Sequence, residues 1–243
     1  VYSHRSNVLH SYALSLVDCF GLSESDVSIL VVPMFHANAW GLPYACLMLG
    51  ADIVFPGRFM VPDAIAGLMA ETGVTCGGGV PTILQAVLPS LVKVKDQLKS
   101  LDRLLCGGSA LPPALQAAYK KELGIHVIHA WGMTETSPLG SMARPISAHK
   151  HASEQTQADA LLSQGRPLFG VELRIVGDSG LDLPWDGKSV GELQARGNWV
   201  AASYYNDDTS PEKFKDGWLC TGDVATIDAD GYVRIADRTK DLV

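Results

Sequence analysis

The stretch RLLCGGSALPPALQAAYKKELGIHVIHA, residues 103–130, holds one complete strand–helix–strand pattern. A short apolar segment at 103–106 is followed by two glycines, and two prolines then open a helical pattern over 112–123. A second apolar segment follows at 125–130. Short apolar strands on both sides of a helix are typical of a βαβ unit, in which the two strands run parallel.

The same alternation extends from this stretch back to the N-terminus. The predicted strands are 27–32, 52–55 and 74–76, and the predicted helices are 6–20, 42–49, 62–72 and 81–92. The first of these helices has Ser6 as its expected N-cap and Gly21 as its end. The repeated pattern predicts an α/β fold, with a parallel sheet flanked by helices.

The pattern changes after residue 143. Residues 144–165 are polar and are interpreted as an exposed excursion. The segments VELRIV, GELQAR, WLCTGDVATID and GYVRIAD then alternate in the manner of half-buried strands. We therefore expect two subdomains, an α/β part at 1–143 and a smaller β-rich, barrel-like part at 144–243.

Composition excludes several classes of function. The net charge of −7 argues against a nucleic-acid surface, because phosphate binding needs clustered Lys and Arg. No apolar run approaches the ~18 residues that suggest a membrane span. The five cysteines stand singly in apolar stretches, a pattern that favours reduced, buried thiols and a cytoplasmic location.

Three unusual stretches follow predicted strands: MFHANAWG (34–41), CGGSALP (106–112) and HAWGMTETSP (129–138). Open α/β sheets bind their ligands at the carboxyl ends of the strands, so these stretches are expected to converge on one crevice. The turn at 106–112 is not a hydrolase elbow, which would need a glycine at Leu111. The G-x-G-x-x-G fingerprint of dinucleotide-binding proteins is also missing, which disfavours a dehydrogenase.

The stretch at 129–138 has two interpretations. The hydroxyl of Thr134 and the carboxylate of Glu135 are suited to a phosphate and its magnesium, with Trp131 stacking on a base. Alternatively, Thr134 is a helix N-cap and Glu135 complements the helix dipole.

Other candidates carry similar alternatives. His36 is a ligand contact or a structural histidine, and Asp223 in TGD holds a ribose or lies in a hairpin turn. The three glycines at 77–79 either leave room in a deep pocket for an alkyl chain or form a tight turn at the end of a strand.

The order of the motifs carries more information than each motif alone. MFHANAWG, GVPT, CGGSALP, WGMTETSP, GWLCTGD and DRTKDL follow one another here as they do in the AMP-forming acyl-activating enzymes. The resemblance covers nearly the whole chain. The amino-acid sequences of the motifs are most similar to those of medium- and long-chain fatty acyl-CoA synthetases.

This resemblance implies a role for particular residues. The nucleotide-binding residues would be Gly108, Ser109, Ala110, His129, Ala130, Trp131, Gly132, Asp223 and Arg238. Among them, Trp131 would stack on adenine, and Asp223 and Arg238 would hold the ribose. Trp131 replaces a more usual Tyr, which keeps the stacking but gives up the phenol's hydrogen bond.

The remaining roles concern the reaction and the acyl chain. Thr134 would contact the α-phosphate and Glu135 would bind Mg²⁺, as the catalytic pair. The acyl-binding residues would be His36, Trp40, Gly79 and Gly132, with Gly132 leaving room for the acyl carbonyl. Lys240 would be the hinge about which a further small domain rotates.

The activity implied by the resemblance is ATP-dependent conversion of a fatty acid, through acyl-AMP, to acyl-CoA. ATP, Mg²⁺ and coenzyme A would be required, and the partners would be small molecules. The chain resembles the central part of the family's large domain, without the upstream phosphate loop and the downstream lysine-bearing domain. The isolated segment is therefore expected to be inactive.

Other functions stay open. One is a ligase for a short, sulfur-containing or aryl carboxylate, and another is a non-catalytic module that binds a nucleotide or an acyl group. The oligomeric state is also open, with a homodimer as one alternative.

Overall fold

The computed structural model describes residues 1–58 and 60–238, and the chain divides into two compact units. The unit Ser11–Ala130 is called here the α/β unit. The other, called the β-rich unit, joins Val1–His10 to Trp131–Val243.

The α/β unit is built on parallel strands. In spatial order they are β2 (Asp52–Val54), β1 (Val27–Leu30), β3 (Cys76–Gly79), β4 (Arg103–Cys106) and β5 (Val127–Gly132). The last two residues of β5 belong to the β-rich unit. The parallel sheet predicted from the alternating pattern is confirmed.

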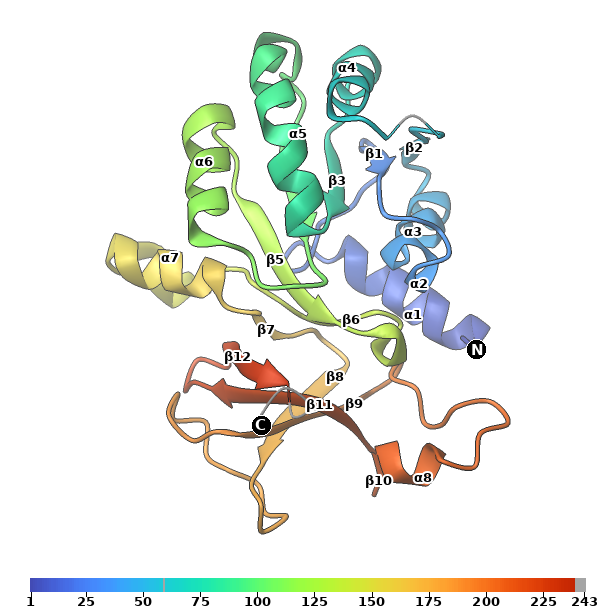
Figure 1. The fold of residues 1–243 in the computed structure, drawn as a ribbon, viewed down its shortest axis with the longest axis vertical. Helices are drawn as coiled ribbons and strands as arrows, with labels where there is room; N and C mark the ends of the chain where they lie inside the picture. Colours follow the sequence, from blue (N-terminus) through green and yellow to red (C-terminus); the bar gives the residue numbers. More distant parts are fainter. Residues whose placement is uncertain (59, 239–243) are drawn as a thin grey trace. The chain divides into compact units, whose positions relative to one another are not determined.

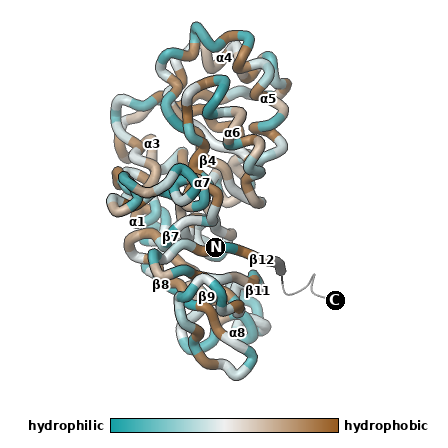
Figure 2. The backbone as a smooth tube through the Cα atoms, turned by 90° about the vertical axis from the view of Figure 1, so that its left-hand side faces the viewer, coloured by the Kyte–Doolittle hydropathy of each residue, from teal (hydrophilic) through white to brown (hydrophobic). Residues whose placement is uncertain are grey.

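Helices connect these strands. They are α2 (Ala37–Trp40), α3 (Leu42–Leu49), α4 (Pro62–Thr72), α5 (Pro81–Lys93) and α6 (Pro113–Leu123), with a 3₁₀ turn, η1 (Lys95–Gln97), after α5. In Figure 1, α4, α5 and α6 lie in a row, and α5 contacts both neighbours. Hydrophilic and hydrophobic residues alternate along them (Figure 2), because one side of each helix meets the core and the other meets solvent.

The core of the α/β unit is a cluster of apolar side chains from the strands and these helices. Its members include Ile29, Met69, Leu91, Leu104 and Val127. Tyr119 is also fully buried, and its hydroxyl donates to the Leu84 carbonyl oxygen at 2.8 Å. Burial of each large aliphatic side chain contributes about 1.5–3 kcal/mol, so this cluster is the main source of the unit's stability.

The β-rich unit begins with α1 (His4–Ser15), whose last residues cross into the α/β unit. Its remaining elements are η2 (Thr134–Thr136), β6 (Leu139–Met142), η3 (Ser147–His151), α7 (Glu154–Leu162), β7 (Arg166–Pro167), β8 (Val171–Val176), β9 (Gly191–Gly197), α8 (Ser210–Lys213), β10 (Phe214–Lys215), β11 (Trp218–Ile227) and β12 (Val233–Arg238). The order β10-β11-β9-β8, with β12 also paired to β11, forms an antiparallel sheet. The second, β-rich part of the predicted fold is confirmed.

Two local predictions were wrong. The helix α1 begins at His4, because the hydroxyl of Ser3 and not that of Ser6 accepts an N–H, from Ser6, at 3.0 Å. The polar excursion contains α7, whose N-cap Ser153 accepts the N–H of Thr156 at 3.1 Å and whose Ala160 is buried.

The five cysteines are all buried. Within the described part of the chain, no helix combines the length and the apolar character that crossing a membrane requires.

A charged network ties the amino ends of three strands together. Asp26, just before β1, accepts hydrogen bonds from Arg103 of β4 at 2.6 Å and from Thr75, just before β3, at 2.6 Å. The Arg103 guanidinium also donates to the carbonyl oxygens of Phe20 and Gly21, at 2.8 and 3.0 Å. Burial opposes ionisation of Asp26, but the hydrogen bonds from Arg103 and Thr75 outweigh it, so the pKa of Asp26 is lowered.

We predict that Asp26→Asn lowers the free energy of unfolding by about 3 kcal/mol, because it leaves the Arg103 side chain, which is only 12% exposed, without its closest countercharge. Urea unfolding of the full-length protein measures this. Because the pKa of Asp26 is lower in the folded chain, its contribution is present above about pH 4 and is lost as the pH falls through the folded pKa.

Asp102→Asn is the matched control. Asp102 pairs with the same guanidinium at 2.8 Å, but its side chain is 70% exposed. We expect a loss of less than about 1 kcal/mol. Equal losses in the two variants would contradict the role given to Asp26.

Candidate functional site

Within the α/β unit, the stretches 34–41 and 106–112 meet the glycines of β3 at the carboxyl ends of the strands. The ring of Trp40, which follows β1, is 6% exposed. Its atoms lie 3.4 Å from the positions that a Cβ would take on Gly78 of β3 and on Gly107 after β4. The bare glycine backbone therefore forms the surface on which this indole packs.

The backbone that carries Trp40 is left-handed. Ala37, Asn38, Ala39 and Trp40 have φ values of 44°, 54°, 50° and 58°. Left-handed geometry costs roughly 1–2 kcal/mol for each non-glycine residue. Strain of this kind persists where the surrounding packing dictates it, and it is commonest at functional sites. His36, just before this turn, is exposed.

The three glycines of β3 are not equivalent. A Cβ on Gly77 would lie 2.7 Å from the Ile29 side chain, and one on Gly78 would lie 3.1 Å from Leu105. A Cβ on Gly79 would make only ordinary contacts of 3.6 Å with Ile83 and Leu84. Close strand packing thus accounts for Gly77 and Gly78, and leaves Gly79 as the acyl-binding candidate that packing does not demand.

The predicted nucleotide-binding residues of this unit differ in exposure. Gly108, Ser109 and Ala110 form an exposed turn after β4, with Gly108 at φ 81°. His129 and Ala130, on β5, are 1% and 5% exposed. The turn is therefore accessible to a ligand, whereas the two β5 side chains are buried.

In the β-rich unit, the segment after β5 forms the 3₁₀ turn η2. The hydroxyl of Thr136 accepts the N–H of Met133 at 2.9 Å, so Thr136 caps the turn. Thr134 is exposed, and its hydroxyl forms no hydrogen bond with the described residues. The alternative that Thr134 is a helix N-cap is therefore wrong.

Gly132 has a structural reason of its own. A Cβ there would lie 1.9 Å from the carbonyl oxygen of Pro138. The end of β5 thus needs a glycine to approach the Pro138 backbone, whether or not a ligand also uses the space.

Asp223 lies at a bulge and not in a hairpin turn. In the β11–β9 pair, Cys220 lies opposite Gln194 and Val224 lies opposite Glu192, so Thr221, Gly222 and Asp223 face a single residue of β9. Gly222 has φ 76°, and the Thr221 hydroxyl accepts the Asp223 N–H at 3.1 Å. Bulges re-aim side chains, and they are over-represented next to active sites.

Trp131 and Asp223 are joined directly. The indole N–H of Trp131 donates to Oδ2 of Asp223 at 2.8 Å, and both residues are 7% exposed. The indole therefore supplies a hydrogen-bond donor of its own, which the sequence analysis did not predict. The backbone of Arg238 lies opposite Asp223 in the β11–β12 pair. Lys240 lies outside the described residues.

Two tyrosines that the sequence analysis missed contact the Thr134–Glu135 turn. The hydroxyl of Tyr204 donates to Oε1 of Glu135 at 2.5 Å, and that of Tyr2 donates to the Thr134 carbonyl oxygen at 2.8 Å. Burial, followed by the Glu135 carboxylate, raises the pKa of each tyrosine to about 12, so both hydroxyls keep their protons at neutral pH. Neither tyrosine lies in one of the six motifs that singled out the other candidates.

Glu135 is a chemically suitable magnesium ligand. Its carboxylate supplies a hard oxygen, and Mg²⁺ is usually held by one or two carboxylates together with substrate phosphates and waters. Across residues 1–58 and 60–238, no three His, Cys, Asp or Glu side chains are grouped to hold a metal by themselves. The donor set therefore fits a metal that binds together with a phosphate.

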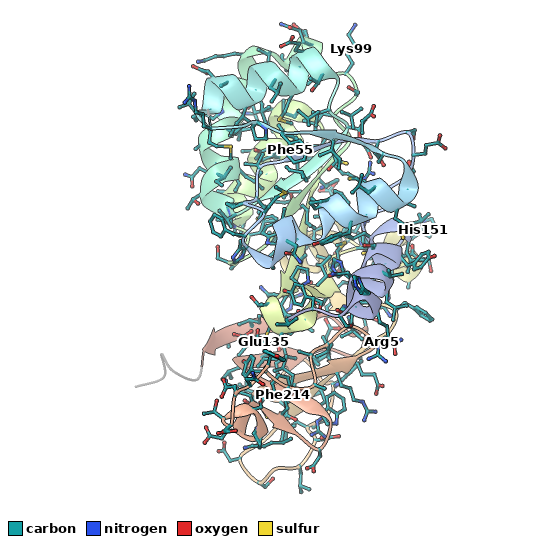
Figure 3. The ribbon with its side chains drawn as sticks, turned by 90° about the vertical axis from the view of Figure 1, so that its right-hand side faces the viewer. Arg5, Phe55, Lys99, Glu135, His151 and Phe214 are labelled. Atoms are coloured by element: carbon teal, nitrogen blue, oxygen red, sulfur yellow. The ribbon has the colours of Figure 1, made fainter. Side chains whose placement is uncertain are left out.

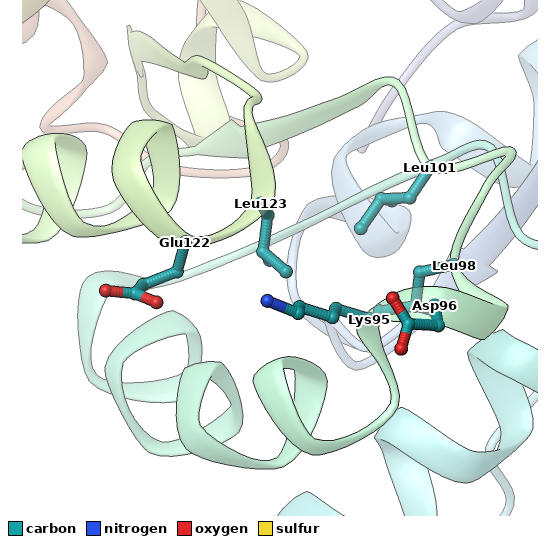
Figure 4. A pocket seen from close by; sticks show the side chains of 6 residues that line it. All are labelled: Lys95, Asp96, Leu98, Leu101, Glu122 and Leu123. Atoms are coloured by element: carbon teal, nitrogen blue, oxygen red, sulfur yellow. The ribbon is translucent and has the colours of Figure 1, made fainter.

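A hollow of about 190 Å³ lies elsewhere in the α/β unit, between η1 and the end of α6. Figure 4 shows its lining residues, which include Lys95, Leu98 and Glu122. These residues precede β4 and β5, so the hollow lies at the amino ends of the strands. Ligand sites of open α/β sheets lie at the opposite edge.

Comparisons with known proteins agree with the motifs. The model of the AMP-binding enzyme family matches residues 1–205. A 3-methylmercaptopropionyl-CoA ligase of Ruegeria lacuscaerulensis is 48% identical over 100% of this chain and 45% of its own length. A medium-chain-fatty-acid–CoA ligase of Ectopseudomonas oleovorans is 45% identical over 100% of this chain and 44% of its own length.

A solved structure is similar over the same region. O-succinylbenzoate coenzyme A synthetase from Bacillus subtilis, in complex with ATP and magnesium, has a TM-score of 0.84 and 26% identity. The match covers 100% of this chain and 47% of that one. The chain thus spans less than half the length of these relatives.

We predict that Ala37→Gly raises the free energy of unfolding by about 0.5–1 kcal/mol, because glycine adopts a positive φ without strain. Ala117→Gly, on the exposed face of α6, is the control and should lower it by about 1 kcal/mol. Urea unfolding of both variants measures the difference. A loss for Ala37→Gly equal to that of the control would contradict the left-handed turn.

Proposed function

Because the chain belongs to the AMP-binding enzyme family, we propose that the full-length protein is an ATP-dependent acyl-CoA ligase for an unbranched aliphatic carboxylate. The adenylation step is supported by the hydrogen bond from Trp131 to Asp223, which links a residue expected at the adenine with one expected at the ribose. The exposed Thr134 and the carboxylate of Glu135 lie in the same unit.

The proposed reaction has two steps. The substrate carboxylate attacks the α-phosphorus of ATP, which gives acyl-AMP and releases pyrophosphate. The thiolate of coenzyme A then attacks the acyl carbonyl and releases AMP. A carboxylate is a poor electrophile, and the mixed anhydride with AMP makes its carbonyl reactive.

The residues described above would each do one task. The Thr134 hydroxyl would donate to an oxygen of the α-phosphate, and Asp223 would accept hydrogen bonds from the ribose hydroxyls. Glu135 would hold Mg²⁺, which supplies neutralisation of the charge that develops on the phosphates. Catalysis would then depend mostly on positioning and on charge stabilisation.

The acyl substrate is the finer part of the proposal. Relatives at 48% and 45% identity are named for a sulfur-containing acid and for medium-chain fatty acids, and one at 43% identity is named for long-chain fatty acids. A thioether is close to a methylene in shape and polarity, so one narrow apolar channel would accept both. We therefore propose straight-chain acids of short to medium length, and rank long-chain and aryl acids below them.

Carboxylate-dependent ATP–pyrophosphate exchange tests the function. With acids from acetate to palmitate, 3-(methylthio)propionate and benzoate, we expect the full-length protein to show one maximum among the straight-chain acids. Asp223→Ala should reduce exchange by about 10- to 100-fold, because charge-assisted hydrogen bonds to the ribose are lost. A folded protein that binds AMP but exchanges with no acid would instead be a binding module.

Gly79 provides a test of the acyl channel. We predict that Gly79→Ala folds normally and lowers kcat/KM for octanoate by about 10-fold, with little change for propionate, because one methyl group shortens the space. Gly77→Ala is the contrasting variant. Its Cβ would meet Ile29, so it should lose stability without a change in preference. An unchanged octanoate-to-propionate ratio in Gly79→Ala would remove Gly79 from the channel.

A further inference from the structure

The carboxylate of Glu135 is held on one side only. Oε1 of this carboxylate accepts a hydrogen bond from the hydroxyl of Tyr204 at 2.5 Å. The backbone carbonyl oxygen of Glu135 accepts one from the N–H of Ala201 at 2.7 Å. Its Oε2 accepts no hydrogen bond from the residues that the structure describes. One oxygen is thus fixed, and the other is left for a ligand.

Tyr204 is itself anchored within the β-rich unit. Its backbone N–H donates to the hydroxyl of Ser210, at the start of α8, at 2.7 Å. Its ring meets that of Phe214 edge to face, with centroids 5.3 Å apart. Figure 3 marks Glu135 and Phe214, the two residues that Tyr204 contacts through its hydroxyl and its ring. The phenol therefore reaches Glu135 from a fixed position.

We propose that Tyr204 is a positioning residue for the magnesium site. This inference rests on the proposed function, in which Glu135 is the metal ligand. By donating to Oε1, the phenol sets the orientation of the carboxylate and leaves Oε2 for the metal. Partners that orient a metal ligand in this way typically affect metal affinity by 10- to 100-fold.

A purely structural role makes a different prediction. Tyr2 fastens the same turn through the backbone carbonyl of Thr134, and it donates no hydrogen bond to the Glu135 carboxylate. If the tyrosines only fasten the turn, Tyr2→Phe and Tyr204→Phe should behave alike. If Tyr204 orients the metal ligand, only Tyr204→Phe should weaken metal binding selectively.

The experiment measures Mn²⁺ binding to the full-length protein by electron paramagnetic resonance, with α,β-methylene-ATP present. We expect Tyr204→Phe to bind Mn²⁺ about 10-fold more weakly, and Tyr2→Phe to remain within about 2-fold of the wild type. AMP affinity without metal should stay within about 2-fold in both. Tyr205→Phe is the neutral control, because the neighbouring Tyr205 is 74% exposed.

Glu135→Gln shows whether Tyr204 acts through Glu135. In that background, Tyr204→Phe should have no further effect on Mn²⁺ binding, because the carboxylate that the phenol is proposed to orient is already lost.

Two results would overturn the inference. In the first, the wild type binds the metal with nucleotide and catalyses exchange, but Tyr204→Phe binds Mn²⁺ with unchanged affinity. Only the positioning role of Tyr204 is then wrong. A wild type with neither property removes the ligase proposal and this inference together.

Discussion

The contact between Arg103 and Asp26 is the constraint on which the α/β unit depends. It connects the start of β1 with β4, and Thr75 adds the start of β3 through the same carboxylate. Parallel strands have no hairpin to set their register, so a polar anchor at the amino ends is a strong determinant of it. The loops at the carboxyl ends of the strands are then not needed to set the register.

Those loops differ from the rest of the unit in their backbone. The turn that carries Trp40 is left-handed at four consecutive non-glycine residues, and the indole packs where Gly78 and Gly107 have no side chain. Burial of a large aromatic ring offsets part of the strain. Glycine therefore serves here to admit a neighbouring ring, which is a requirement of packing as much as of ligand binding.

The fold could be predicted from the sequence because the alternation of short apolar strands with helices depends on local periodicity. The helix α7 was missed because its stretch is mostly polar, although Ser153 is a recognisable N-cap. The candidate residues came largely from the order of motifs. The hydrogen bond from Trp131 to Asp223 could not be predicted, because it joins residues 92 positions apart and Asp223 lies at a bulge in β11. Tyr204 was missed for the same reason, since nothing in SYYND indicates a contact with Glu135.

The same kind of hydrogen bond occurs twice in the β-rich unit. Each carboxylate expected to meet the nucleotide accepts a hydrogen bond from an aromatic side chain, Asp223 from an indole and Glu135 from a phenol. Both donors are neutral, and the phenol keeps its proton because its pKa is raised to about 12. A neutral donor fixes the direction of a carboxylate without cancelling its charge. If Glu135 is the metal ligand, as proposed, its carboxylate would meet a divalent cation in an orientation that need not be established anew when the cation binds.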